Sequence, residues 1–475
     1  MYINKENNAS YNLVAPSIDD DADKKVETVF PTAEAVEPVS DLLAPDPRIG
    51  AWRAEACRYE TIMRRLYAGG IHPDDRARNY TVFGAPIRSK FRPMPHQEAA
   101  LSAWLAAKCR GIVAMPTGSG KTFLAFLAIA AVRRSALVVV PTIDLMHQWA
   151  SQLERAFEVP VGMLGGGSSD VRTLTVSTYD SAVLRMPQIG DRFGLAIYDE
   201  CHHLPGEVNR LSASLCLAPY RLGLSATPDT GESFPVMCDL LGPLVYRTEI
   251  NELEGGVLSP YRTVRLRLGL TPEEAAEYNA AHGKYVAFLR ANNIRFQDGS
   301  GWSDFIALCA RRPGGRDAYR AYLKQRAIAR CGSAKLREVW RIVRENPTAR
   351  TIVFTADNDT AYKIGEALCL PVLTHKTKAA ERKDFLERFR SGEYPVLVTS
   401  KVLNEGVDVP EANIGIVVSG SGCTREHVQR LGRILRRAEG KEAVLYELVS
   451  DGTSEMSVSD RRRQNSAYSR RRRSC

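Results

Sequence analysis

Two blocks of short apolar runs, each alternating with longer helical patterns, constrain the fold of this 475-residue chain more than any other feature. Each run is apolar almost throughout instead of alternating, which is typical of a strand buried on both faces. Strands that alternate with helices form a parallel sheet that those helices cover on both sides. We therefore expect an α/β fold with two parallel-sheet lobes. The runs are GIVAM, ALVVV, TLTVS, LAIYD and RLGLS in the first block, and TIVFT, PVLTH, YPVLVTS, IGIVVSG and AVLYELV in the second.

Composition divides the rest of the chain. Residues 1–50 are rich in Pro, Asp and Ala and hold four basic and ten acidic side chains, which favours a disordered acidic leader. Residues 51–88 form a short N-terminal segment that begins with one amphipathic helix, from Trp52 to Tyr67. The remaining expected divisions are a first lobe at 89–250, a linker and helical insert at 251–345, a second lobe at 346–455 and an Arg-rich tail at 456–475.

The charge distribution favours a polyanionic partner. The formal net charge is +9, and residues 461–475 hold seven arginines and no acidic residue. A basic body with an Arg-rich tail suits nucleic acid, although a merely solvated tail would have the same composition.

Membrane and secreted classes do not fit the sequence. The longest apolar stretch, Phe123 to Val132, is ten residues, about half of what a membrane-spanning helix needs. The ten cysteines are scattered and form no C-x-x-C pair, which indicates reduced thiols and a cytoplasmic location.

A phosphate-binding loop follows the first strand. Residues 115–122 read MPTGSGKT and open the helical run FLAFLAIAAV. Glycines let backbone N–H groups turn onto phosphate at a helix N-terminus, Lys121 would reach the β- and γ-phosphates of ATP, and Thr122 would bind Mg²⁺. The general pattern has Gly where Met115 stands, so a chance Gly-Ser turn is the alternative. The residues expected at the phosphates are Thr117, Gly118, Ser119, Gly120, Lys121 and Thr122.

Two carboxylates follow another buried strand, LAIY. Asp199, at the end of that strand, would hold Mg²⁺ through water, and Glu200 would orient or deprotonate the attacking water. Cys201, His202 and His203 are adjacent on one turn, where three side chains rarely converge on one ion.

These motifs, in this order, resemble those of the superfamily two helicases and translocases. The matching stretches are RPMPHQ at 92–97, VPT at 140–142, STY at 177–179, DECH at 199–202, SAT at 225–227, TSKVLNEGVD at 399–408 and QRLGRILR at 429–436. Narrower stretches are typical of XPB-like helicases, namely HHLP at 202–205, IVFT at 352–355, SGSG at 419–422 and LYEL at 445–448.

The resemblance implies two RecA-like lobes and an ATP-dependent DNA helicase or translocase that moves 3′ to 5′. It also implies a role for single residues. Adenine would be read by Gln97 and ribose bound by Asp408. Nucleic acid would be contacted by Thr142, Thr178 and Thr399. ATP hydrolysis would be coupled to movement by Ser225, Thr227 and His202, the last as a contact between lobes. The γ-phosphate would be reached by Gln429, Arg433 and Arg436.

Several alternatives stay open on the sequence. The Ser and Thr residues at strand ends are as suited to capping helices as to binding phosphates. Arg430, Arg433, Arg436 and Arg437 could form no more than a solvated basic helix face. The Arg-Glu-Asp element common in the XPB-like group is absent from the chain, so strand separation is in doubt and a DNA clamp that translocates without unwinding is one alternative. The DECH motif does not distinguish DNA from RNA, so an RNA helicase is another. The expected partners are DNA, as a single strand or fork, and a nuclease or loader protein, with repair, transcription and defence all compatible.

Overall fold

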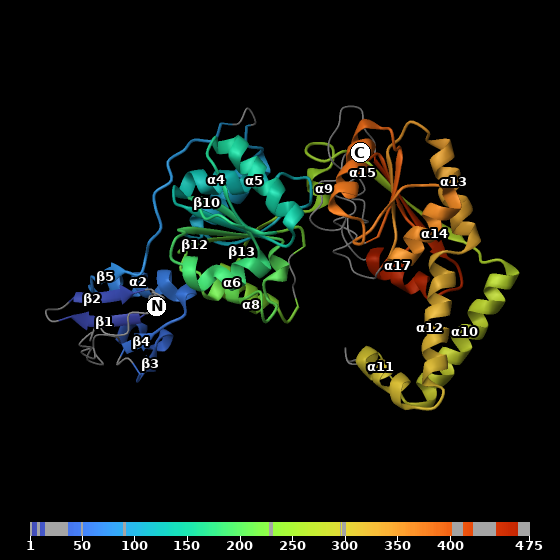
Figure 1. The fold of residues 1–475 in the computed structure, drawn as a ribbon, viewed down its shortest axis with the longest axis horizontal. Coiled ribbons are helices and arrows are strands. Elements are labelled where there is room, and N and C mark those ends of the chain that lie inside the picture. The colour runs from blue at the N-terminus through green and yellow to red at the C-terminus, as the bar shows by residue number, and fades with distance from the viewer. Residues whose placement is uncertain are drawn as a thin grey trace, which may run out of the picture. The chain divides into compact units, whose positions relative to one another are not determined.

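The computed structural model divides into two compact units, Met1–Thr248 and Glu249–Cys475 (Figure 1). No helix among the described residues is long and apolar enough to cross a membrane. The described residues are 2–6, 10–14, 37–48, 51–88, 92–227, 231–294, 296, 301–400, 412–420 and 443–463.

The first unit is built on an eight-stranded sheet with the order β13-β6-β12-β11-β7-β10-β8-β9. All pairings are parallel except that of β8 with β9. The five strands predicted for this block are all present. The bounds are β6 Arg110–Ala114, β7 Ala136–Val140, β8 Gly162–Gly165, β9 Ser168–Ser169, β10 Leu174–Thr178, β11 Leu195–Asp199, β12 Tyr220–Ser225 and β13 Leu244–Arg247.

Helices cover both faces of this sheet, as the continuous apolar runs predict. Successive strand residues point to opposite faces. Val138 of β7 accordingly packs in the core under α3, α4 and α5, and Leu137 and Val139 pack in the core under α6, α7 and α8. Figure 1 shows α4 and α5 on one side of the sheet and α6 and α8 on the other. The bounds are α3 Pro95–Ala106, α4 Lys121–Val132, α5 Ile143–Phe157, α6 Tyr179–Ile189, α7 Leu211–Ser214 and α8 Phe234–Leu241.

The N-terminal region differs from the sequence prediction. A five-stranded sheet, β3-β4-β1-β2-β5, includes strands from residues 1–50, so the expectation of a disordered leader is wrong for those residues. The compositional bias of the whole stretch concealed two five-residue strands that pair as a hairpin. The predicted helix also begins later, because Trp52 belongs to a strand that pairs with Ile3 and Pro45. The bounds are β1 Tyr2–Glu6, β2 Ser10–Val14, η1 Glu37–Leu42, β3 Ala44–Asp46, β4 Ala51–Arg53, η2 Ala56–Arg58, α2 Tyr59–Ala68 and β5 Asp74–Arg76.

The second unit is built on a six-stranded, wholly parallel sheet with the order β14-β19-β18-β15-β17-β16. Its five predicted strands are present, but β14 falls inside the range expected to be linker and insert. The alternating arginines of YRTVRLRL concealed this strand, which pairs with β19 over eight residues. The bounds are β14 Tyr261–Leu268, β15 Thr351–Phe354, β16 Val372–Leu373, β17 Val396–Thr399, β18 Ile414–Val417 and β19 Ala443–Ser450.

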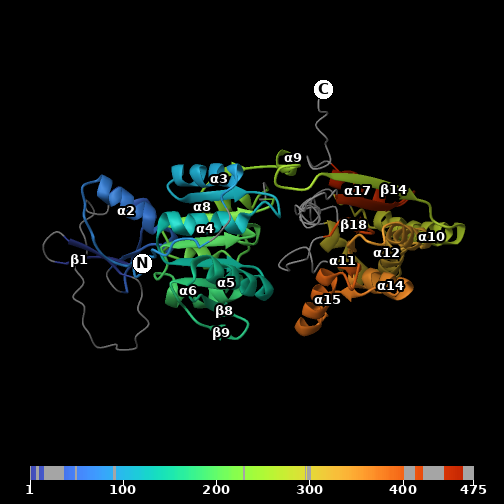
Figure 2. The same ribbon diagram turned by 90° about the horizontal axis from the view of Figure 1, so that it is seen from above.

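Helices on the two faces of this sheet enclose separate cores. Helices α13 and α14 pack on one face, and α9 and α15 on the other. Between β14 and α13 the chain forms α10, α11 and α12, which confirms a helical insert; α10 and α12 lie side by side (Figures 1 and 2). The bounds are α9 Ile250–Leu253, α10 Pro272–Ala291, α11 Gly301–Arg311, α12 Gly315–Arg330, α13 Ser333–Glu345, α14 Asn358–Leu368, α15 Ala379–Ser391 and α17 Glu455–Arg463.

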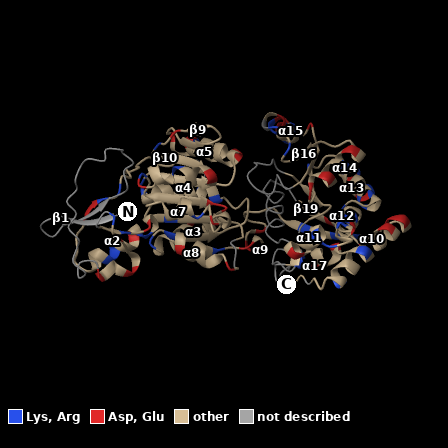
Figure 3. Ribbon diagram, turned by 60° about the horizontal axis from the view of Figure 1, so that its bottom comes forward, with Lys and Arg blue, Asp and Glu red and all other residues tan. Residues whose placement is uncertain are grey.

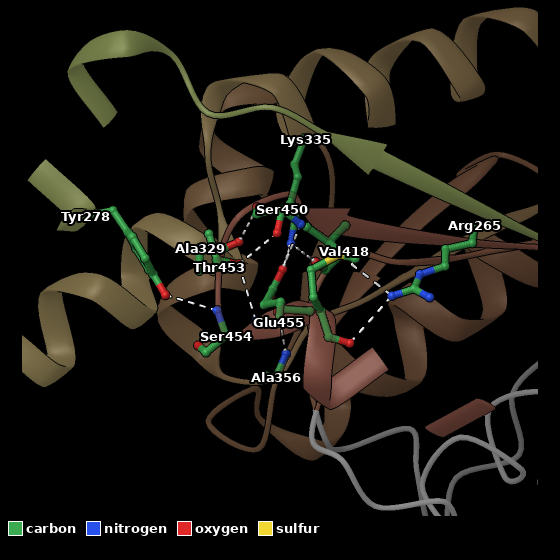
Figure 4. A network of polar contacts seen from close by, with 12 residues as sticks. Arg265, Tyr278, Ala329, Lys335, Ala356, Val418, Ser450, Thr453, Ser454 and Glu455 are labelled. Atoms are coloured by element: carbon green, nitrogen blue, oxygen red, sulfur yellow. Dashed lines mark hydrogen bonds and ion pairs between the residues drawn. The ribbon is translucent and has the colours of Figure 1, made fainter. Parts of the chain in front are cut away.

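A buried lysine joins the base of the insert to the end of the sheet (Figure 4). Lys335, in the first turn of α13, is 1% exposed and donates to the carbonyl of Val418, next to the end of β18, at 2.7 Å. The same ammonium pairs with Glu455 Oε2 at 2.5 Å. Glu455 Oε2 also accepts from the Ser450 N–H at 3.2 Å, and Ser454 N–H donates to the Tyr278 hydroxyl of α10 at 3.0 Å. The turn between β19 and α17 is thus held by α10 and α13.

Lys335→Met is expected to destabilise the second unit because it leaves Glu455, whose side chain is only 14% exposed, without its cation. Loss of one partner of a buried ion pair costs about 3–5 kcal/mol. Urea unfolding followed by circular dichroism measures the change. The matched control is Lys383→Met, because Lys383 is 79% exposed and its pair with Glu387 is 3.9 Å long, so that change is expected to cost under about 1 kcal/mol. Equal midpoints for the two variants would show that the buried network does not stabilise the unit.

Candidate active site

The loop between β6 and α4 has the backbone that a phosphate-binding loop requires. Gly118 and Gly120 have φ values of +86° and +88°, a conformation that other residues adopt only with strain. A Cβ on Gly120 would lie 2.2 Å from Gln97 Nε2, so α3 packs directly against the loop. The predicted loop residues therefore form one turn at the start of α4.

Two buried side chains of α3 fix the loop from outside. Gln97 Nε2 donates to the Gly120 carbonyl at 3.1 Å, and its Oε1 accepts from the Met94 N–H at 2.9 Å. His96 Nε2 lies 2.8 Å from the Ser119 carbonyl. Gln97 thus supports the loop backbone, while its predicted contact with adenine stays a prediction. His96 was not singled out from the sequence, although its position beside Gln97 was the available signal.

Lys121 and Glu200 bring a buried cation and a buried anion together. Lys121 Nζ lies 3.7 Å from Glu200 Oε1, and the side chains are only 11% and 13% exposed. The ammonium has no hydrogen-bond acceptor among the residues that the structure describes, and the same holds for the Thr117 hydroxyl. A buried ammonium without an acceptor fits an anionic ligand on the loop.

The two carboxylates of the DECH motif differ in their surroundings. Asp199 ends β11, and its Oδ1 accepts from the Glu200 N–H at 2.9 Å while Oδ2 accepts from Trp149 Nε1 at 2.9 Å. Burial first, and then the Glu200 charge, raise the pKa of Asp199, while Lys121 opposes the rise. Glu200 has φ +46° and ψ +50°, a left-handed conformation that is costly for a non-glycine residue and turns the chain sharply after the strand.

A chain of polar contacts links this motif to the end of β12. His202 Nδ1 lies 3.4 Å from Glu200 Oε2 and 3.3 Å from Ser225 Oγ. Ser225 Oγ also accepts from the Thr227 N–H at 3.2 Å, and the Ser225 carbonyl accepts from the Met115 N–H of the loop at 2.9 Å. The three predicted coupling residues therefore lie together within the first unit. The expected contact of His202 between lobes stays a prediction.

The three threonines predicted to contact nucleic acid have structural roles. Thr142 caps α5 by accepting from the Leu145 N–H at 3.3 Å, and Thr178 caps α6 by accepting from the Ser181 N–H at 3.3 Å. Thr399 is fully buried at the end of β17 and donates to the Ser400 carbonyl at 3.3 Å. Capping is thus present at the first two positions, and contact with phosphate stays a prediction at all three.

The other predicted site residues lie outside the described part of the chain. These are Asp408, Gln429, Arg433 and Arg436.

A metal ion would be held by the groups that the sequence predicts. Thr122 stands in the first turn of α4, which packs against β11, and Asp199 ends β11. A hydroxyl and a carboxylate are the hard oxygen ligands that Mg²⁺ prefers, so the residues present fit this ion. The described residues contain no cluster of three His, Cys, Asp or Glu side chains that could bind a metal by themselves.

Comparison with known proteins gives the class of the chain. The family described as "Type III restriction enzyme, res subunit" matches residues 90–230, and the family described as "ERCC3/RAD25/XPB C-terminal helicase" matches residues 318–468. The helicase domain of Pyrococcus furiosus Hef has a similar fold, with a TM-score of 0.50 and 19% identity, over 78% of this chain and 98% of that one. The two-lobed fold is that of a helicase.

Curated relatives narrow the class to one family. The chain is 38% identical to the DNA 3′-5′ translocase XPB2 of Sulfurisphaera tokodaii, over 90% of this chain and 98% of the relative. It is 31% identical to the DNA 3′-5′ helicase XPB of Mycobacterium tuberculosis, over 74% of this chain and 59% of that relative. The chain belongs to the XPB family of helicases, which implies that it binds a nucleotide.

Gly120→Ala is expected to weaken nucleotide binding about 10-fold or more, because a left-handed non-glycine residue costs about 1–3 kcal/mol and the new methyl group would displace Gln97. Titration with a fluorescent nucleotide measures the affinity. Gly84→Ala is the control, because the nearest described atom to its methyl group would be Arg133 Nη2, at 3.5 Å, an ordinary contact distance, so the affinity should be unchanged. Wild-type affinity in Gly120→Ala would contradict the loop assignment.

Proposed function

We propose that this protein is an ATP-dependent DNA translocase, which couples ATP hydrolysis to 3′-to-5′ movement on DNA. The observation that carries the proposal is the buried Lys121 ammonium, which has no hydrogen-bond acceptor in the part of the chain that the structure describes and lies 3.7 Å from Glu200 at the carboxyl edge of a parallel sheet. The names of the XPB relatives support DNA as the track and 3′ to 5′ as the direction.

The site residues of the first unit have different roles in ATP hydrolysis. The N–H groups of the glycine loop and Lys121 bind the phosphates, and their positive charge stabilises the transition state. Thr122 and Asp199 would hold Mg²⁺, which neutralises charge on the β- and γ-phosphates. Glu200 orients water or takes its proton, and its carboxylate lies 3.7 Å from the Lys121 ammonium of the phosphate loop.

His202 connects the phosphate site to the end of β12, so that ATP hydrolysis can change contacts outside the phosphate site. Its ring lies against both Glu200 Oε2 and Ser225 Oγ, and Ser225 in turn accepts from the loop at Met115. A change in the charge or position of Glu200 therefore alters contacts at the end of β12. Arg433 and Arg436 are proposed from the sequence to stabilise the γ-phosphate, with Gln429 beside them.

The charge of the helical insert supports a polyanionic track. Helix α12 carries five basic residues and one acidic residue, and Figure 3 marks its Lys and Arg positions. Arg316, Arg320 and Lys324 are exposed at four-residue spacing, which places them on one face of the helix. The 251–345 region is thereby proposed to act as a thumb that contacts the nucleic-acid backbone.

The nucleic-acid substrate is tested by measuring ATP turnover with single-stranded DNA, duplex DNA and RNA. DNA is expected to stimulate turnover and RNA to do so far less. A strand-displacement assay of both polarities then separates unwinding from translocation, and the missing Arg-Glu-Asp element predicts weak unwinding. Stimulation by RNA alone would replace the proposal with an RNA helicase. A nuclease or loader partner and a cytoplasmic location remain proposals from the sequence.

Glu200→Gln is expected to lower turnover by about 10²–10⁴-fold and to preserve nucleotide affinity, because the amide keeps the shape but cannot accept a proton. Lys121→Ala should weaken nucleotide binding itself. Steady-state ATPase assays and nucleotide titration measure the two effects. Glu207→Gln, the same change at an exposed position nearby, should leave both unchanged. Normal turnover in Glu200→Gln would contradict the assignment of Glu200 as the general base.

A further inference from the structure

The carboxylate of Asp199 is fixed by two hydrogen bonds of different origin. The Glu200 N–H, which Oδ1 accepts, belongs to the next residue of the same turn. The Trp149 N–H, which Oδ2 accepts at 2.9 Å, comes from α5, fifty residues away in the sequence. Only the second bond ties the carboxylate to a separate element of the fold.

Trp149 is itself held firmly, so its single N–H has a fixed direction. The side chain is 2% exposed and lies in the core under α3, α4 and α5. Its ring meets Phe126 of α4 edge-on, with centroids 6.2 Å apart and planes at 86°. The contact with Phe126 of α4 thus holds the Trp149 indole of α5 in place beside the helix that follows the phosphate loop.

We propose that Trp149 is a positioning residue for the bound metal–nucleotide complex, holding the Asp199 carboxylate in the orientation that Mg²⁺–ATP requires. This inference rests on the proposed function. Carboxylates that ligate metals are commonly held by such outer hydrogen bonds, and loss of the partner typically lowers metal affinity about 10–100-fold. Without its donor, Asp199 can rotate away from the metal, while the loop and Lys121 still bind the phosphates.

The chain offers a closely matched control in Trp104. This tryptophan is 1% exposed, lies in the same hydrophobic core, and donates its Nε1–H at 2.9 Å, but to the backbone carbonyl of Arg221. Trp149→Phe and Trp104→Phe therefore remove the same atoms from the same core. They differ in whether the acceptor is the metal-binding carboxylate.

The experiment compares the affinity of a fluorescent ATP analogue in excess Mg²⁺ with its affinity in EDTA, for the full chain. In the wild type and in Trp104→Phe, Mg²⁺ should strengthen binding by the same factor. In Trp149→Phe that factor should fall about 10-fold, while the affinity in EDTA stays at the wild-type value. A half-saturating Mg²⁺ concentration for turnover that rises by a similar factor would agree.

The same Mg²⁺ factor in the two phenylalanine variants would overturn the inference and leave the proposed function intact. A wild type that binds no nucleotide would overturn both. Should Trp149→Phe fail to fold by circular dichroism, 3-benzothienylalanine at position 149 replaces it, since sulfur removes the donor and keeps the bicyclic shape. An unchanged Mg²⁺ factor with that residue would equally overturn the inference.

Discussion

The attraction between Lys121 and Glu200 is the interaction on which the geometry of the site in the first unit depends. Both side chains are nearly buried, so each loses most of its hydration, and only a nearby opposite charge offsets that cost. The pair lies at 3.7 Å without a hydrogen bond, and a phosphate chain on the loop would give the ammonium a second anion. The glycine backbone, the left-handed turn at Glu200 and the contact of His202 with Ser225 all place groups relative to this pair.

The threonines at the strand ends show that a structural role and a binding role need not compete. A hydroxyl that caps a helix accepts a hydrogen bond and keeps its own proton to donate, which at Thr178 goes to Ser181 Oγ at 3.0 Å. Thr142 comes two residues after the end of β7, and Thr178 is the last residue of β10. The two strands are neighbours in the sheet, so the two caps lie at the same edge. An anionic backbone passing that edge would meet hydroxyl groups whose positions are set by the start of each helix.

The sequence predicted what depends on local pattern and missed what depends on register. Continuous apolar runs located the central strands, and the spacing of GSGKT located the loop, because each of these signals consists of residues that are adjacent in the sequence. The bond from Trp149 to Asp199 joins positions fifty residues apart and follows only once α5 is packed on the sheet. Gln97 was expected at adenine, but its contact with Gly120 depends on how α3 docks. β14 was missed because its arginines alternate with apolar residues, a pattern that favours an edge strand.

The pairing of β14 with β19 determines how late in synthesis β14 can join its sheet. β14 ends at Leu268, and β19 begins at Ala443 and provides its pairing partner in the sheet. During translation the eight residues of β14 must therefore wait, with their peptide groups hydrated, until almost all of the second unit has left the ribosome. Such distant closure is slow, and the arginines along this strand are the kind of charge that discourages pairing with another chain in the meantime.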